Sequence, residues 1–169
     1  MDANALRALQ APLKERYKQD PDAAVVTLKA QGSSDDAGLA CKVDTGKALA
    51  IAGLHPATGG TGAELCSGDM LLEALVACAG VTLKVVATAL EIPLRAATVR
   101  AEGDLDFRGT LGVDRAAPVG FRAIRVTVDL DTDAPEEKVA KLLQLTERYC
   151  VVFQTLARTP QLSLAASRG

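Results

Sequence analysis

One segment of this chain is apolar on nearly every side of the helix that it is expected to form. It spans residues 69–90, reads DMLLEALVACAGVTLKVVATAL, and carries only Glu73 and Lys84 as charges after Asp69. Its length approaches the roughly 20 residues that cross a membrane, but the internal charges and the amphipathic segments that follow favour a buried helix of a protein core. A helix without a polar side must be covered from several directions, which predicts a second subunit.

The composition fits one soluble domain without a nucleic-acid or membrane partner. The chain has 169 residues, of which 49% are hydrophobic and 24% charged, so it can bury a core without disulfide staples. Aromatic residues make up 3% and the net charge is -2. These values argue against stacking platforms for single-stranded nucleic acid and against a basic surface for phosphates.

The four cysteines lie at positions 41, 66, 78 and 150. Their spacing is not that of a zinc site, and nothing in the sequence indicates a secreted protein in which they would form permanent disulfides. The sequence has no CxxC pair and a single histidine, so we expect no metal and no bound cofactor. The N-terminal segment lacks the apolar stretch of a signal peptide. We therefore expect a cytoplasmic protein with free thiols, in which any disulfide is transient.

The predicted helices and strands do not strictly alternate along the chain. We expect a helix over 3–18, strands over 24–30, 39–43 and 48–52, the apolar helix over 69–90, strands over 98–108 and 121–130, a helix from the capping box at Asp133 and Glu136 to about Ala157, and an edge strand over 162–165. The Gly-rich stretch 54–67 is expected to be a loop. This order predicts an α+β domain over 23–169, preceded by a helical arm over 1–22.

Two cysteines, Cys78 and Cys150, lie on the two apolar helices. A free cysteine in such a place most often packs as a small apolar group. The pair is more informative, because two packed core helices can bring two Cα atoms to the separation of about 5.5–6 Å that a disulfide requires. An attacking thiol and a resolving thiol would then share one site.

Three motifs together give the chain a family resemblance. With GDMLLEALVACAGVTL, the later helical cysteine in ERYCVVFQTL and the Gly-rich HPATGGTG, it resembles the OsmC family and its organic hydroperoxide resistance relatives over residues 24–165. The resemblance implies an OsmC-like α+β fold in which two central helices pack between antiparallel sheets of an intertwined homodimer. It also implies a stress-response function as a cysteine-based, peroxiredoxin-like peroxidase with active sites at the subunit interface.

Carried over residue by residue, the resemblance gives chemical roles to Cys78, Cys150 and Asp69. Cys78 matches the peroxidatic cysteine, whose thiolate attacks a peroxide oxygen and becomes a sulfenic acid. Cys150 matches the resolving cysteine, which forms a disulfide that an external dithiol or lipoyl-type reductant reopens. Asp69 matches the acidic position near the start of the helix, which pairs with an arginine in the better studied members. An apolar pocket would suit alkyl or lipid-derived peroxides.

The sequence departs from the family pattern around the activating cation. A thiolate among apolar groups has a raised pKa unless something compensates, yet the loop QGSSDDAG has Ser33 and Ser34 where the arginine is expected. Arg16, Lys42 and Lys47 are the other residues that could supply the activating cation. Cys150 is followed by Val151, where the family often has proline. The missing arginine leaves an alternative open, a protein of the same fold that binds a small apolar ligand without peroxidase activity.

The remaining polar candidates have simpler explanations. Glu73 is expected to form a structural ion pair or to act in the site. Cys66 lies twelve residues before Cys78, about 18 Å along a continuous helix, and is too distant to be its partner. We expect Cys41 to be packed in a strand, and His55 to lie on a surface loop rather than in a Cys–His dyad.

Overall fold

The computed structural model describes residues 3–34, 42–43, 53–63 and 65–165. In chain order its elements are α1 (Ala3–Gln19), the 3-10 turn η1 (Pro21–Ala24), β1 (Val25–Ser34), β2 (Lys42–Val43), the 3-10 turn η2 (Pro56–Thr58), α2 (Ser67–Ala89), β3 (Ala96–Asp106), α3 (Phe107–Thr110), β4 (Phe121–Asp131), α4 (Glu136–Tyr149) and α5 (Val151–Ala157). The expected α+β class is confirmed.

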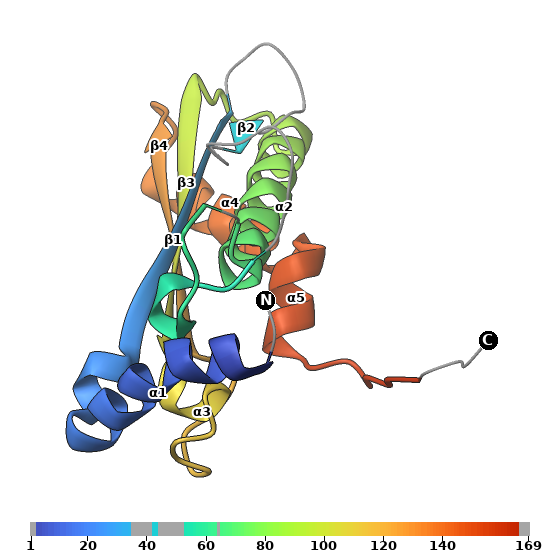
Figure 1. Cartoon of the computed structure of the whole chain (residues 1–169). Coiled ribbons are helices and arrows are strands. Elements are labelled where there is room, and N and C mark those ends of the chain that lie inside the picture. The colour runs from blue at the N-terminus through green and yellow to red at the C-terminus, as the bar shows by residue number, and fades with distance from the viewer. Residues whose placement is uncertain (1–2, 35–41, 44–52, 64, 166–169) are drawn as a thin grey trace.

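The strands form one antiparallel sheet in the order β2-β1-β3-β4. β1 pairs with β3 from Val25 opposite Asp106 to Ser34 opposite Ala97. Figure 1 shows α2 lying along one face of this sheet, with α4 and α5 continuing the helical layer. Because β3 alternates between buried and less buried residues, one of its faces supplies the apolar surface on which α2 packs.

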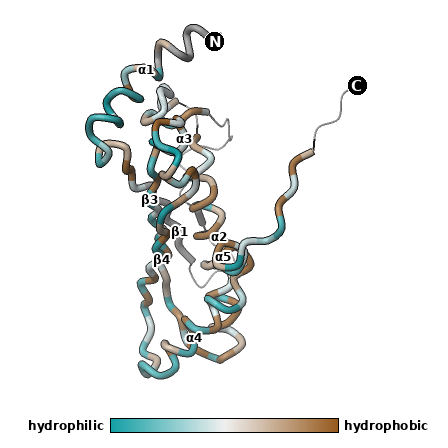
Figure 2. Tube along the Cα trace, turned by 90° about the horizontal axis from the view of Figure 1, so that it is seen from below, coloured by the Kyte–Doolittle hydropathy of each residue, from teal (hydrophilic) through white to brown (hydrophobic). Residues whose placement is uncertain are grey.

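Within the described residues, α2 is buried on one side and exposes apolar residues on another. Leu72, Leu75 and Leu83 are at most 1% exposed and face the core, whereas Val81 and Val85 on another side are 38% and 46% exposed. Figure 2 shows α2 as largely hydrophobic along its length. By length and hydropathy α2 would also suit a membrane span, but its packing on the sheet makes it the central core helix. The described residues do not bury it all round, so the second subunit expected from the sequence stays a prediction.

α1 docks on the segment that precedes α2. The Tyr17 side chain is 2% exposed, and its hydroxyl donates to the Ala57 carbonyl oxygen at 2.7 Å. The Gln10 side-chain amide donates to the Thr58 carbonyl oxygen at 3.4 Å. The expected helical arm therefore contacts η2 of its own chain through polar as well as apolar groups.

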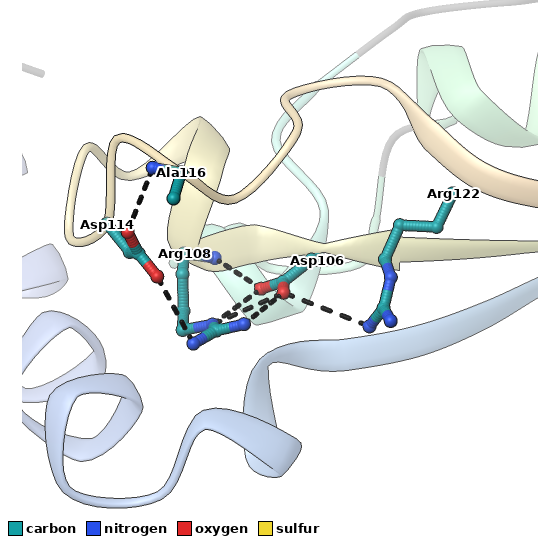
Figure 3. Close-up of polar contacts among 5 residues, drawn as sticks. All are labelled: Asp106, Arg108, Asp114, Ala116 and Arg122. Carbon is teal, nitrogen blue, oxygen red and sulfur yellow. Dashed lines mark hydrogen bonds and ion pairs between the residues drawn. The ribbon is translucent and has the colours of Figure 1, made fainter.

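A buried carboxylate fixes the end of β3 (Figure 3). Asp106 is 2% exposed and accepts from Arg108 Nε at 3.0 Å and from Arg108 Nη2 at 2.6 Å. Arg108 Nη1 also lies 3.4 Å from an oxygen of Asp114, and Arg122 Nη1 lies 4.0 Å from Asp106 Oδ2. The hydrogen bonds from Arg108 hold the pKa of Asp106 below its ordinary value. This network joins β3, α3 and the loop that follows them.

Most of the predicted elements are present, with ends shifted by a few residues. The helices over 3–18 and 69–90 correspond to α1 and α2, and the strands over 24–30, 98–108 and 121–130 correspond to β1, β3 and β4. Only residues 42–43 of the strand expected over 39–43 are described, and they form β2. The strand expected over 48–52 lies outside the described residues, as does Cys41.

Two predicted elements are wrong in the described part of the chain. Residues 162–165 do not form an edge strand, because Leu162 and Leu164 are 80% and 101% exposed and the segment extends away from the sheet (Figure 1). Their alternation resembles a strand, but no sheet edge lies beside them. The helix expected to reach Ala157 without interruption is divided at Cys150 into α4 and α5.

Candidate thiol site

The division between α4 and α5 occurs at Cys150, whose backbone is extended (φ -70°, ψ 108°). Its N–H still donates to the Thr146 carbonyl oxygen at 2.9 Å, which closes α4, and its carbonyl oxygen accepts from Gln154 N at 2.9 Å, which opens α5. The first N–H groups of a helix have no carbonyl partner within that helix. The interruption therefore presents new backbone donors in the middle of an apolar region.

Those donors point to Cys78. The Cys78 sulfur, on the half-buried side of α2, accepts hydrogen bonds from the backbone N–H groups of Val152 and Val151 and from the thiol of Cys150. The hydroxyl of Thr82, one turn further along α2, is a fourth donor. The structure thus brings the two cysteines singled out in the sequence into direct contact, although they are far apart along the chain.

The two thiols differ in acidity. Burial raises the pKa of Cys78, but the hydrogen bonds from Val152, Cys150, Val151 and Thr82 outweigh burial, and the net pKa lies below the ordinary value. These donors stabilise the thiolate without carrying a charge. For Cys150, burial raises the pKa to about 11, and the contact with Cys78 acts in the same direction. Cys78 therefore ionises more readily than Cys150, which keeps its proton to higher pH.

Cys150 is the more buried of the two cysteines. Its side chain is 1% exposed, and its sulfur accepts from Phe153 N at 3.5 Å. This contact caps the start of α5. Cys150 thus has a local structural function, ending one helix and beginning another, in addition to its contact with Cys78.

Asp69 does not lie with the thiols. It is in the first turn of α2, nine residues before Cys78, which is about 13 Å along a helix. Burial raises the pKa of Asp69 and the charge of His55 opposes this, so its neighbour is a histidine rather than an arginine. Glu73, one turn further on, has a pKa that is raised by burial and by Asp69.

The other candidates whose side chains are described are not among the residues that contact the pair. His55 is half-buried rather than on the surface, stacks on Phe107 with ring centroids 5.0 Å apart, and accepts from Ala57 N through Nδ1 at 3.0 Å. Cys66 occupies the position just before α2. Arg16 is exposed on α1. The side chains of Ser33, Ser34, Lys42 and Lys47 lie outside the described residues.

Two pockets lie beside the helices that carry the thiol pair. The larger, of about 470 Å³, lies between α2, β4 and α5, with apolar lining from Leu71, Leu75, Phe121, Ile124, Phe153 and Leu156. Leu71 and Leu75 precede Cys78 by seven and three residues and so share its side of α2. The smaller, of about 200 Å³, is lined by Cys150 itself. Within the described residues, no cluster of three or more His, Cys, Asp or Glu could hold a metal ion.

Comparison with known proteins places this site in a familiar fold. The family model of OsmC-like proteins matches residues 60–165. The structure is similar to the crystal structure of an OsmC-like hydroperoxide resistance protein from Jannaschia sp. CCS1, with a TM-score of 0.63 and 18% sequence identity over 86% of this chain and 95% of that chain. At this identity the likeness concerns the fold. No curated protein gave a sequence match.

Proposed function

Because the chain belongs to the OsmC-like protein family, we propose that it is a thiol-dependent peroxidase that reduces organic hydroperoxides. The observation that carries the proposal is the contact between Cys78 and Cys150, in which one thiol has a lowered and the other a raised pKa. A thiol that ionises more readily, next to a thiol that keeps its proton, is the arrangement that peroxide reduction and disulfide formation require.

The first step is attack of the Cys78 thiolate on the distal oxygen of the hydroperoxide. A sulfur–oxygen bond forms, the oxygen–oxygen bond breaks, and the alkoxide leaves as the alcohol after taking a proton. The sulfur is oxidised to a sulfenic acid and the peroxide is reduced. The Cys150 thiol, which already donates toward Cys78, is the nearby source of that proton.

The second step joins the two cysteines. Once Cys150 has given up its proton, its thiolate attacks the sulfur of the Cys78 sulfenic acid, and hydroxide leaves and takes a proton from solvent to become water. The product is a Cys78–Cys150 disulfide. An external dithiol or lipoyl-type reductant then returns both cysteines to the thiol state.

The larger pocket supports organic rather than inorganic peroxide as the substrate. Its described lining is mainly apolar, and it runs along the side of α2 that carries Cys78. An alkyl chain removes this apolar surface from water, which hydrogen peroxide cannot do. Alkyl and lipid-derived hydroperoxides are therefore the substrate class that we assign.

A homodimer in the cytoplasm is part of the same proposal. Leu71, Val81 and Val85 are large apolar residues of α2 that this chain leaves 37%, 38% and 46% exposed, and a second copy would cover them. The reaction needs free thiols between turnovers, which a reducing compartment preserves. The alternative, a binding protein without redox chemistry, is not favoured, because ligand binding does not require two thiols in contact.

The direct test is peroxide consumption with cumene hydroperoxide as substrate and dithiothreitol as reductant. We expect turnover that exceeds turnover with hydrogen peroxide, and its complete loss in Cys78→Ser. Cys66→Ser is the matched control, because Cys66 is also half-buried but lies before α2, away from the pair. Circular dichroism checks that each variant folds. Absence of turnover, or full activity of Cys78→Ser, would contradict the proposal.

A further inference from the structure

Cys150 has two different surroundings on its two sides. Toward α2 it contacts Cys78. On another side it lines the smaller pocket, of about 200 Å³, together with Ala79 of α2, Val128 of β4 and Thr146 of α4. Cys78 does not line this pocket, which we call the Cys150 pocket. A molecule in this pocket lies against Cys150 rather than Cys78.

The opening of the Cys150 pocket lies beside exposed residues of α4. Leu143 is 38% exposed, and Glu147, on the next turn, is exposed. Among the described lining residues, Glu147 is the only one that carries a charge. The larger pocket shares Phe153 and Val126 with the Cys150 pocket but lies between α2, β4 and α5, and neither cysteine is among its described lining residues. Of these two pockets, the Cys150 pocket is thus the one that a cysteine of the pair lines.

We propose that the Cys150 pocket is the entry site for the reducing thiol, and that the reductant attacks the sulfur of Cys150 while Cys78 is the leaving group. This inference deepens the proposed peroxidase function and rests on it. The substrate and the reductant then use different pockets, so that reduction does not require the alcohol product to leave the larger pocket first.

The chemistry of the step is balanced with a dithiol as reductant. One thiolate of the dithiol forms a bond to the sulfur of Cys150, the Cys78–Cys150 bond breaks, and Cys78 departs with the electron pair as a thiolate. The second thiolate of the reductant then attacks the first sulfur of the reductant, which is bonded to Cys150. The reductant closes into a cyclic disulfide and releases Cys150, which takes a proton. Two electrons pass from the dithiol to the protein.

The acidity of the two thiols favours this direction of attack. A disulfide breaks faster when the departing sulfur has the lower pKa. The hydrogen bonds from Val151, Val152 and Thr82 lower the pKa of Cys78, whereas burial raises that of Cys150. Attack at Cys150 therefore expels the better leaving group, and the donors that receive the new thiolate are already in place.

Size and charge define the class of reductant. About 200 Å³ admits a narrow alkyl dithiol but leaves little room for a peptide. The carboxylate of Glu147 at the opening disfavours an anionic thiol and favours a neutral or cationic one. The pocket thus fits a neutral dithiol on an alkyl chain better than an anionic peptide thiol.

The first test identifies the sulfur that is attacked. The protein is oxidised with diamide, without peroxide, treated briefly with cysteamine, quenched with iodoacetamide and mapped by mass spectrometry. We expect the cysteamine adduct on Cys150 and the alkyl group on Cys78; the reverse labelling would overturn the inference while leaving the peroxidase proposal intact. If diamide forms no Cys78–Cys150 disulfide, both the inference and the proposed function fail.

The second test separates the two routes with variants that narrow each pocket. Leu143→Trp should slow reduction of the preformed disulfide by dithiothreitol and leave the single-turnover reaction with cumene hydroperoxide unchanged. Leu156→Trp, in the larger pocket, should slow the single-turnover reaction with cumene hydroperoxide and leave the reduction of the preformed disulfide unchanged. Equal effects of the two variants on both half-reactions would overturn the inference. An unchanged reduction rate in Leu143→Trp would also overturn it, and this is the result expected if another copy of the chain covers the Cys150 pocket.

The third test concerns the charge of Glu147. Glu147→Gln should raise the rate of disulfide reduction by 3-mercaptopropionate relative to cysteamine by about 25-fold, because the two reductants differ by two unit charges and each charge contributes about fivefold at about 4 Å in water. Glu137→Gln is the matched control, because Glu137 is an exposed residue of the same helix outside the pocket lining. An unchanged ratio in Glu147→Gln would argue against entry beside this residue.

Discussion

The N–H group of Val151 and the sulfur of Cys78 form a hydrogen bond that joins the start of α5 to the middle of α2. Val151 directly follows the residue at which the helical chain is interrupted. Together with Val152, it stabilises a thiolate in a region where burial alone would oppose ionisation. Within the described residues, neutral donors thus stabilise the thiolate for which the family pattern led us to expect a loop arginine.

Replacing Val151 by proline should weaken this activation. Proline has no N–H to donate, but it is well tolerated at the first position of a helix. We expect the pKa of Cys78 to rise in Val151→Pro, and a rise of one unit would reduce thiolate-dependent rates at neutral pH by about tenfold. Val151→Ala, which keeps the N–H, should behave like the wild type. Rates of alkylation of Cys78 by iodoacetamide, resolved by peptide mapping, provide the measurement.

The two thiols should also differ in how their alkylation depends on pH. Because the pKa of Cys78 is lowered, its alkylation rate should reach its plateau at a lower pH than in the urea-unfolded protein. Because the pKa of Cys150 is raised to about 11, its alkylation should stay slow until strongly alkaline pH. Identical profiles for Cys78 in the folded and unfolded protein would show that the hydrogen bonds from α5 do not stabilise its thiolate.

The Asp106–Arg108 pair should stabilise the fold in a pH-dependent way. Removing one partner of a buried ion pair leaves the other without that partner, and because Arg108 is itself 21% exposed we expect Arg108→Gln to lower the free energy of unfolding by less than the loss of a fully buried pair would. The control is Arg125→Gln, whose partners Asp104 and Glu102 are more exposed and for which we expect a smaller loss than for Arg108→Gln.

The sign of the pH effect follows from the lowered pKa of Asp106. The stabilisation is complete above the unfolded-state pKa of about 3.9, and it is lost as the pH falls through the lower folded-state pKa. The difference between wild type and Arg108→Gln, measured by urea unfolding, should therefore be constant between pH 5 and 7 and shrink in strong acid. A difference that grows on acidification would contradict this assignment.

The exposed apolar side of α2 should control assembly. Val85 is 46% exposed there, and an aspartate at this position would place a charge in a dry interface, which is unfavourable. We expect Val85→Asp to convert a dimer into monomers, as measured by light scattering after size-exclusion chromatography. Val119→Asp, at a loop residue that is 66% exposed, should leave the mass unchanged. A wild-type chain that is already monomeric would contradict the dimer.

The sequence was sufficient to predict the parts of the fold that depend on a regular pattern. The apolar run over residues 69–90 and the alternation over 98–108 and 121–130 correspond to α2, β3 and β4. Cys78 and Cys150 could be paired because both lie on apolar helices, and the structure places them in contact. Their chemical roles remain a proposal, as does the second subunit.

Other features depend on contacts that no local pattern reports. The apolar periodicity of the last helical region continues through Cys150, so nothing in it marks the extended backbone at that residue. The partner of Asp69 was expected from the family pattern, whereas the structure places His55 beside it. The closely spaced Asp106 and Arg108, at the end of a predicted strand, were the available sign of the buried ion pair and were not recognised.

The single extended residue between α4 and α5 has a consequence for how such a site is recognised. Amide groups belong to every residue other than proline, so the donors to Cys78 are specified by the path of the chain rather than by the kinds of side chain it carries. A comparison of residue types alone would record a lost arginine and infer a disabled centre. The replacement becomes visible only in three dimensions.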